Sequence, residues 1–158
     1  MMSYFIRLLI LLFIFLNASA LHAETAIEGF LKESKGGSYE PPSAAELRKA
    51  EELFGCLFKG KLTDDVQREW DKLNFKVVRM KEGKEEFILL EEKETHKTGR
   101  GFYLFRLSNY RTIAIQSPHS VDDLYTGEIT IELMLEGSFV SAAWNTVPRN
   151  NNEKGESS

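Results

Sequence analysis

The first half of the chain repeats apolar residues at the spacing of amphipathic helices. Between Ser43 and Phe58, apolar residues recur every three or four positions and so share one helical face. Ser43 followed three residues later by Glu46 is a capping-box pattern that begins this helix, and Gly60 ends it. The same kind of pattern predicts helices over residues 24–35, 43–58 and 64–73. Residues 35–42, with two glycines and two prolines, predict a linker.

The spacing of apolar residues changes to a period of two at Phe75, which is typical of half-buried strands. Glu82-Gly-Lys-Glu85 reads as a hairpin turn, and residues 91–101 read as a polar, flexible connection. Strands are predicted over residues 75–78, 87–90, 101–107, 111–116 and 139–144.

A helix is predicted between the last two strands, over residues 123–136. Leu124, Ile129, Leu133 and Met134 form its expected apolar side, with Glu128, Glu132 and Glu136 outside. A strand–helix–strand unit implies two parallel strands joined by a crossover. We therefore expect an α/β fold in which N-terminal helices precede a mixed sheet that contains a strand–helix–strand unit.

The amino terminus has the features of a cleaved export signal. Arg7 supplies positive charge, and residues 8–16 form an unbroken apolar run that is too short for a membrane span. Cleavage is expected after Ala23, with Ala20 nearly as suitable, which predicts a periplasmic or secreted protein. The expected organisation is a signal peptide (1–23), an N-terminal segment and linker (24–42), one α/β domain (43–148) and a disordered tail (149–158).

The net charge and the cysteine content limit which partners and which covalent links the chain can have. The formal net charge is −4, which argues against a general affinity for nucleic acids or anionic membranes. Cys56 is the single cysteine, so no internal disulfide can form, and its apolar neighbours favour a buried, unreactive thiol.

The most informative candidate site follows the fourth strand. His119 comes just after this strand, and Asp122 and Asp123 follow within four residues. Ligands in α/β sheets bind beyond the carboxyl ends of strands, and a His with a carboxylate can supply part of a zinc site. Alternatively, His119 is an exposed loop residue, and Asp122 or Asp123 caps the next helix.

Arg100 is a further candidate for contact with a ligand, whereas His96 is not. Arg100 lies between two glycines, and such an Arg can offer a bidentate fork to a substrate carboxylate, although a solvated loop Arg is the alternative. His96 lies in a polar loop and is expected at the surface. The sequence contains no dinucleotide-binding glycine motif, phosphate loop, nucleophile elbow or cysteine pair.

Several short motifs together resemble a known group of enzymes. Gly99-Arg-Gly-Phe-Tyr103, Pro118-His-x-x-x-Asp-x-x-Thr-Gly127 and Asn145-Thr-Val-Pro-Arg149 are similar to motifs of secreted bacterial proteins. These proteins resemble zinc-dependent N-formylglutamate amidohydrolases and carboxypeptidases of the phosphorylase/hydrolase fold. The resemblance spans residues 43–149 and implies that His119 and Asp123 are zinc ligands, with Asp122 a neighbour.

The chain departs from that pattern at Pro148, where a His is expected, and no His follows His119. The expectation is therefore an exported relative of zinc-dependent amide hydrolases, comprising the amino-terminal half of the domain, with an incomplete site and little activity. The catalytic residues are not assigned. The alternatives are a non-catalytic periplasmic binding domain or an adaptor. The expected ligands are a small peptide or an acyl-amino acid, and self-association is expected through a sheet edge left open after Trp144.

Overall fold

The computed structural model describes residues 25–108 and 110–148. Residues 1–24, which include the predicted signal peptide, residue 109 and the predicted disordered tail (149–158) lie outside these residues. The elements are helices α2 (Ala26–Ser34), α3 (Ala44–Phe58), α4 (Asp64–Lys72) and α5 (Thr126–Glu136), and strands β1 (Phe75–Glu82), β2 (Glu85–Glu92), β3 (Phe102–Arg106), β4 (Arg111–Ser117) and β5 (Phe139–Trp144). Among the described residues, no helix has both the length and the apolar composition needed to cross a bilayer.

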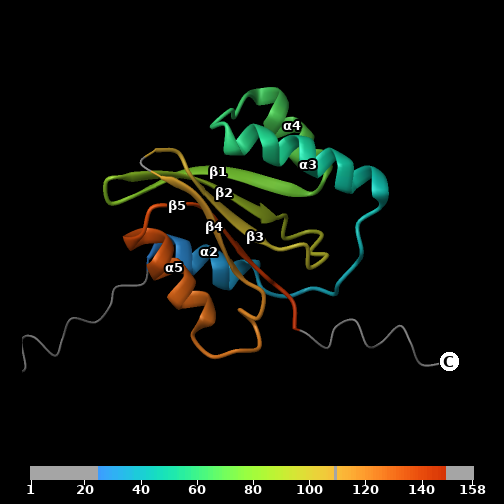
Figure 1. Cartoon of the computed structure of the whole chain (residues 1–158). Coiled ribbons are helices and arrows are strands. Elements are labelled where there is room, and N and C mark those ends of the chain that lie inside the picture. The colour runs from blue at the N-terminus through green and yellow to red at the C-terminus, as the bar shows by residue number, and fades with distance from the viewer. Residues whose placement is uncertain (1–24, 109, 149–158) are drawn as a thin grey trace, which may run out of the picture.

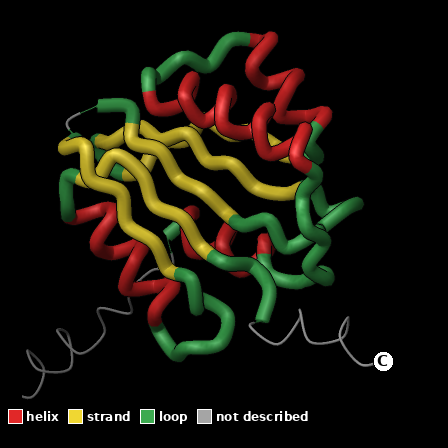
Figure 2. The backbone as a smooth tube through the Cα atoms, turned by 45° about the vertical axis from the view of Figure 1, so that its right-hand side comes forward, coloured by secondary structure: helices red, strands yellow, loops and turns green. Residues whose placement is uncertain are grey.

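The five strands form one mixed sheet in the order β1-β2-β3-β5-β4. The pairs β1–β2, β2–β3 and β3–β5 are antiparallel, whereas β4 and β5 are parallel neighbours connected through α5. Helices cover both faces of the sheet: α3 and α4 lie on one face, and α2 and α5 on the other (Figures 1 and 2). The expected α/β class, the mixed sheet and the parallel strand–helix–strand unit are confirmed.

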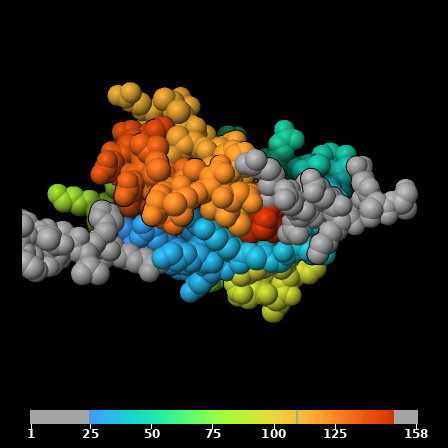
Figure 3. Space-filling model, turned by 90° about the horizontal axis from the view of Figure 1, so that it is seen from below, coloured from blue at the N-terminus to red at the C-terminus, as the bar shows by residue number. Residues whose placement is uncertain are grey.

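Each face of the sheet carries its own hydrophobic core, because successive side chains of a strand point to opposite faces. The α2 and α5 side buries Ile27, Leu31, Ile131 and Met134 against Phe87, Leu89, Phe102, Leu104, Ala142 and Trp144. The α3 and α4 side buries Leu53, Leu57 and Trp70 against Phe75, Ile88, Leu90 and Phe105. Figure 3, seen from below, shows α2 and the α5 region side by side on the first of these faces.

The helices α3 and α4 cover only part of their face. Their buried core draws on β1, β2 and β3 and includes no residue of β4 or β5. On this face β4 and β5 carry small or polar side chains, namely Ala114, Gln116, Ser141 and Ala143. A third helix would be needed to cover these strands, so the described part of the chain leaves this area of sheet open.

The helices predicted from apolar spacing are confirmed in α2, α3 and α4, including the capping box of Ser43 and Glu46. The start of α5 differs from the prediction. It begins at Thr126 with Tyr125 as N-cap, and no side chain caps it, so the alternative in which Asp122 or Asp123 caps this helix is wrong. Tyr125 has φ of +65°, a left-handed conformation that ends the preceding turn and starts the helix.

The buried face of α5 also differs from the prediction. Leu124, Ile129 and Leu133 are exposed, with 78%, 51% and 48% of their surface accessible. The helix instead faces inward through Gly127, Thr130, Ile131 and Met134. A Cβ at Gly127 would lie 3.3 Å from Leu31 Cδ2, so close packing against α2 selects the face with the smallest residue.

The open edge of the sheet is not where the sequence suggested. The strand that ends at Trp144 is β5, which lies between β3 and β4 with partners on both sides. The expectation of an unpaired edge after Trp144 is therefore wrong at that strand. The edges of the sheet are β1 and β4.

Arg106 ties the end of β3 to the junction between α5 and β5. Its side chain is only 3% exposed, and its Nη1 lies 2.8 Å from a carboxylate oxygen of Glu85. The remaining nitrogens donate to the carbonyls of Met134, Gly137 and Phe139. The guanidinium also lies 4.9 Å from the centroid of the Phe87 ring. The carbonyls at the end of a helix have no hydrogen-bond donor within the helix, and the buried Arg106 side chain supplies donors at the end of α5.

We predict that Arg106→Met lowers the free energy of unfolding by about 3 kcal/mol, because it leaves several carbonyls without a donor and Glu85 without its partner. Urea unfolding followed by circular dichroism measures the change. Arg79→Met, at an exposed position of β1, is the matched control and is expected to change stability by less than about 0.5 kcal/mol. Equal effects of the two substitutions would contradict this role for Arg106.

Candidate functional site

Three connecting segments meet at one end of the sheet. They precede β3 (residues 99–101), begin at the last residue of β4 (117–120) and follow β5 (145–147). They meet because β4 and β5 end together as parallel strands, while antiparallel β3 begins at that end. The Asn145 N–H donates to the Ser117 carbonyl at 3.2 Å, and the Ser120 hydroxyl donates to the Asn145 carbonyl. This is the strand end at which α/β sheets bind ligands.

Buried polar atoms without partners gather in these segments. Arg100 Nε, Ser117 Oγ, His119 Nδ1 and Thr146 Oγ1 are buried and have no hydrogen-bond partner among the described residues. Ser117 and Thr146 are 3% and 1% exposed. Buried polar groups in folded proteins nearly always have partners, so such a group requires an explanation, for example a ligand.

Glu92 fixes the segment that carries Arg100. Its carboxylate is buried and accepts hydrogen bonds from the Thr98 amide at 2.8 Å, the Thr98 hydroxyl at 2.6 Å and the Arg100 amide at 3.1 Å. The sequence suggested a flexible polar connection over residues 91–101. Instead, β2 extends through Glu92, and this carboxylate anchors the rest of the connection.

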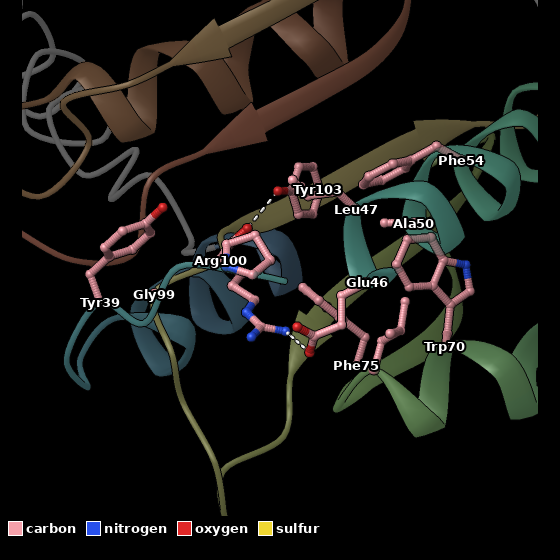
Figure 4. Close-up of a pocket in the computed structure, with 12 residues that line it drawn as sticks. Tyr39, Glu46, Leu47, Ala50, Phe54, Trp70, Phe75, Gly99, Arg100 and Tyr103 are labelled. Atoms are coloured by element: carbon pink, nitrogen blue, oxygen red, sulfur yellow. Dashed lines mark hydrogen bonds and ion pairs between the residues drawn. The ribbon is translucent and has the colours of Figure 1, made fainter. Parts of the chain in front are cut away.

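Arg100 is held from a second side by Glu46. Nη1 of Arg100 lies 2.8 Å from Oε1 of Glu46, and the Arg100 side chain is 17% exposed (Figure 4). The other Glu46 oxygen accepts from the Ser43 amide at 2.7 Å. These hydrogen bonds, the Ser43 amide first and Arg100 second, lower the pKa of Glu46 to about 2. Arg100 is thus partly buried and forms an ion pair with the first turn of α3. It is not a solvated loop residue.

Tyr103 lies next to Arg100 and faces α3. Its hydroxyl donates to the Arg100 carbonyl at 2.5 Å, and its ring packs edge-on against Phe54, with the ring centroids 5.1 Å apart (Figure 4). Burial raises the pKa of Tyr103 to about 12, and the charge of Glu92 adds to this effect. The hydroxyl therefore remains protonated and serves as a hydrogen-bond donor.

An apolar groove runs from this point over the uncovered strands. It has a volume of about 670 Å³ and is lined by Leu47, Ala50, Phe54 and Phe58 of α3, by Tyr103 and Phe105 of β3, and by Ala114, Gln116, Ser141 and Ala143 of β4 and β5, among others. Mostly small residues form its floor. The floor is open because α3 and α4 do not pack on β4 and β5. The large aromatic rings of α3 and β3 form its wall.

Two smaller cavities adjoin the groove at Tyr103, which lines all three. One, of about 230 Å³, contains Tyr39, Glu46, Trp70 and Arg100. The other, of about 250 Å³, contains Arg100, Gln116, Ser117 and Asn145 and lies at the strand ends. At Tyr103 the apolar groove therefore meets two smaller and more polar cavities, and Arg100 lines both of these smaller cavities.

His119 and Asp123 lie in one turn, residues 118–125, directly after β4. The amides of Asp122 and Asp123 donate to the His119 carbonyl at 3.1 and 2.9 Å. His119 is half-buried, and both aspartates are exposed. Within residues 25–108 and 110–148, no three His, Cys, Asp or Glu side chains are grouped closely enough to hold a metal ion. The zinc site stays a prediction, with two candidate ligands in this turn.

His96 is exposed in the connection between β2 and β3, as the sequence suggested. Sequence reasoning missed Glu92, Tyr103 and the groove. In the sequence, Glu92 is one of several acidic residues near the end of a strand, and nothing distinguishes it from them. Tyr103 lies in an aromatic strand, where its pattern indicates only packing within the sheet. The groove exists only because two helices cover three of five strands, which no local pattern indicates.

No protein-family model, curated protein or solved structure matches this chain. The function is therefore inferred from the geometry of the groove and of its polar end.

The low pKa of Glu46 leads to a pH-dependent prediction. A carboxyl whose pKa is about 2 in the folded protein and about 4.5 when unfolded stabilises the fold above about pH 5 and loses this effect as the pH falls toward 2. We expect Glu46→Gln to be less stable than the natural protein at pH 7, with the difference shrinking below pH 5. Urea unfolding between pH 7 and pH 3 measures it, with Glu51→Gln on the same helix as control. A difference that is independent of pH would contradict the assignment.

Proposed function

We propose that this chain is an exported, non-catalytic binding domain for amphiphilic carboxylates of the N-acyl amino acid type. The observation that carries the proposal is the apolar groove on the uncovered face of β4 and β5, which meets at Tyr103 two smaller cavities that Arg100 lines. Its volume of about 670 Å³ falls within the range of sites for small molecules, which is roughly 300–1,000 Å³.

The two parts of such a ligand match the two parts of the site. An acyl chain would lie along the floor formed by Ala114, Ser141 and Ala143, under the rings of Phe54 and Phe58. Burial of each methylene group contributes about 0.8 kcal/mol. The carboxylate would accept hydrogen bonds from Arg100, whose Nη1 is already engaged by Glu46 and whose Nε has no partner among the described residues.

The charge of Glu46 opposes a second carboxylate at Arg100, and two features offset it. The amino terminus of α3 begins at this point and carries a partial positive charge. The Arg100 fork retains donors beyond the one used by Glu46. Removal of the Glu46 charge is therefore expected to strengthen ligand binding, even though it weakens the fold.

We predict that dodecanoyl-alanine binds the purified protein, as measured by isothermal titration calorimetry. Arg100→Met should weaken binding about tenfold or more, since a charge-assisted hydrogen bond contributes about 1.5–3 kcal/mol. It should have little effect on the uncharged dodecanoyl amide of ethanolamine. Glu46→Gln should tighten binding of the carboxylate, and Ala143→Trp, which fills the groove, should abolish binding of both ligands.

Arg79→Met is the matched control, because it removes a positive charge at an exposed position of β1. Failure of every acylated ligand to bind would refute the proposal. Full binding by Ala143→Trp would place the ligand elsewhere.

Metal-dependent amide hydrolysis is the second candidate. His119 Nδ1, buried and without a partner in the described residues, favours it, as does Asp123 in the same turn at the carboxyl end of β4. His119 and Asp123 would hold zinc, and a bound zinc would polarise the scissile carbonyl and activate water. A catalytic zinc takes three protein ligands, and the described residues offer two here. We therefore rank hydrolysis below binding.

We predict that zinc binds weakly and that the zinc-loaded protein turns over N-acyl amino acids at less than about 1 per second, below the ordinary enzyme range. Equilibrium dialysis with metal analysis measures the binding, and amine release measures the turnover. Tight zinc binding and faster turnover that His119→Ala and Asp123→Ala both remove would establish the hydrolase and displace our first proposal.

A further inference from the structure

The two edges of the sheet differ in how well they are protected from pairing. An unpaired edge strand offers free backbone donors and acceptors to another chain, and charged side chains are a usual defence. The β1 edge carries Lys76, Arg79, Lys81 and Glu82. In β4, Arg111 is charged, but residues 112–117 read Thr-Ile-Ala-Ile-Gln-Ser, with no charge and no proline. The β4 edge is thus the less protected of the two.

Most of the exposed large hydrophobic side chains in the described residues lie on β4 or on α5 and its preceding turn. Ile113, on β4, is 52% exposed. Leu124 and Tyr125 precede α5 and are 78% and 63% exposed, and Ile129 and Leu133 follow one turn apart on the outer face of the helix. Because α5 packs on both β4 and β5, this apolar face lies close to the open edge. In Figure 3 the α5 region forms one flank of the molecule.

We propose that β4 pairs antiparallel with β4 of a second copy of this chain across a two-fold axis. A two-fold interface brings the same patch of both copies together, so the two α5 helices would lie side by side and cover Ile129 and Leu133. The core on the α5 face, against which Ile115 of β4 packs, would then continue from one copy to the other.

The charges at the two ends of β4 select the antiparallel arrangement. Arg111 is exposed at the start of the strand, and the turn after its end carries the exposed carboxylates of Asp122 and Asp123. Antiparallel pairing places Arg111 of each copy near the acidic turn of the other. Parallel pairing would place Arg111 beside Arg111. Two antiparallel copies of β4 are thus complementary in charge, whereas two parallel copies are not.

The pairing length is set by a local irregularity in β4. Between Arg111 and Ala114, β4 contains one more residue than β5, which is typical of a bulge. The regular part that remains is residues 114–117. This short ladder needs the apolar contact between the α5 helices to be stable, which explains why both features occur at one edge.

Both proposals involve β4, but they use different parts of it. The ligand groove uses side chains on the α3 face, whereas the copies pair through the backbone edge of β4 and meet through α5 on the other face. A variant that fills the groove is therefore not expected to change the association of the chain.

Sedimentation velocity over a range of concentrations tests the dimer. The natural protein should be a dimer, and Arg111→Asp and Asp122→Arg should each raise the dimer dissociation constant by about tenfold or more, because each places like charges in contact twice per dimer. The chain with both substitutions should return to within about threefold of the natural value, since both contacts are restored with reversed sign. Arg79→Asp, on the β1 edge, is the control and should change nothing.

Amide hydrogen exchange provides a readout that does not depend on variants. The amides of residues 114–117 should exchange more slowly as the protein concentration rises, whereas those of the β1 edge should not. A natural protein that stays monomeric at all concentrations would overturn the proposal. So would a charge-reversed chain that associates no better than the single variants, or an Arg111→Asp variant with natural affinity.

Discussion

The position of β5 between β3 and β4 is the constraint on which the other features depend. β5 pairs antiparallel with β3 and parallel with β4. It therefore joins the antiparallel strands β1, β2 and β3 to β4, its partner in the strand–helix–strand unit. This arrangement brings residues 99–101, 117–120 and 145–147 together at one end of the sheet. It also moves β4 to the outside, beyond the reach of α3 and α4. The candidate ligand groove and the open edge both follow from this one strand.

Two buried charged residues hold this arrangement at opposite ends of the sheet. Arg106 joins the end of β3 to the carbonyls around the end of α5, and Glu92 fixes the connection that carries Arg100. Both are satisfied mainly by backbone groups, so each fixes the path of a segment and not only a pair of side chains. The Arg100–Glu46 ion pair extends the second of these networks to the start of α3.

Local sequence patterns predicted the elements well and their packing less well. The capping box at Ser43 and the alternation that begins at Phe75 are local signals, and they identified α3 and β1. The inward face of α5 could not be predicted this way, because close contact with Leu31 through Gly127 outweighs the larger apolar residues Ile129 and Leu133. The roles of Arg106 and Glu92 depend on carbonyls and amides that are distant or unremarkable in sequence. His119 and Asp123 were placed correctly at a strand end, but their chemistry is not decided by that position.

We propose that a ligand binds on the uncovered sheet face beside α3. Chemical shift mapping by NMR with dodecanoyl-alanine tests it most directly, because it locates the ligand without any substitution. The account predicts that the largest shifts occur at Ala114, Ala143 and Tyr103, with a further shift at the Arg100 side chain. Shifts confined to the α5 face, or no shifts at saturating ligand, would contradict it.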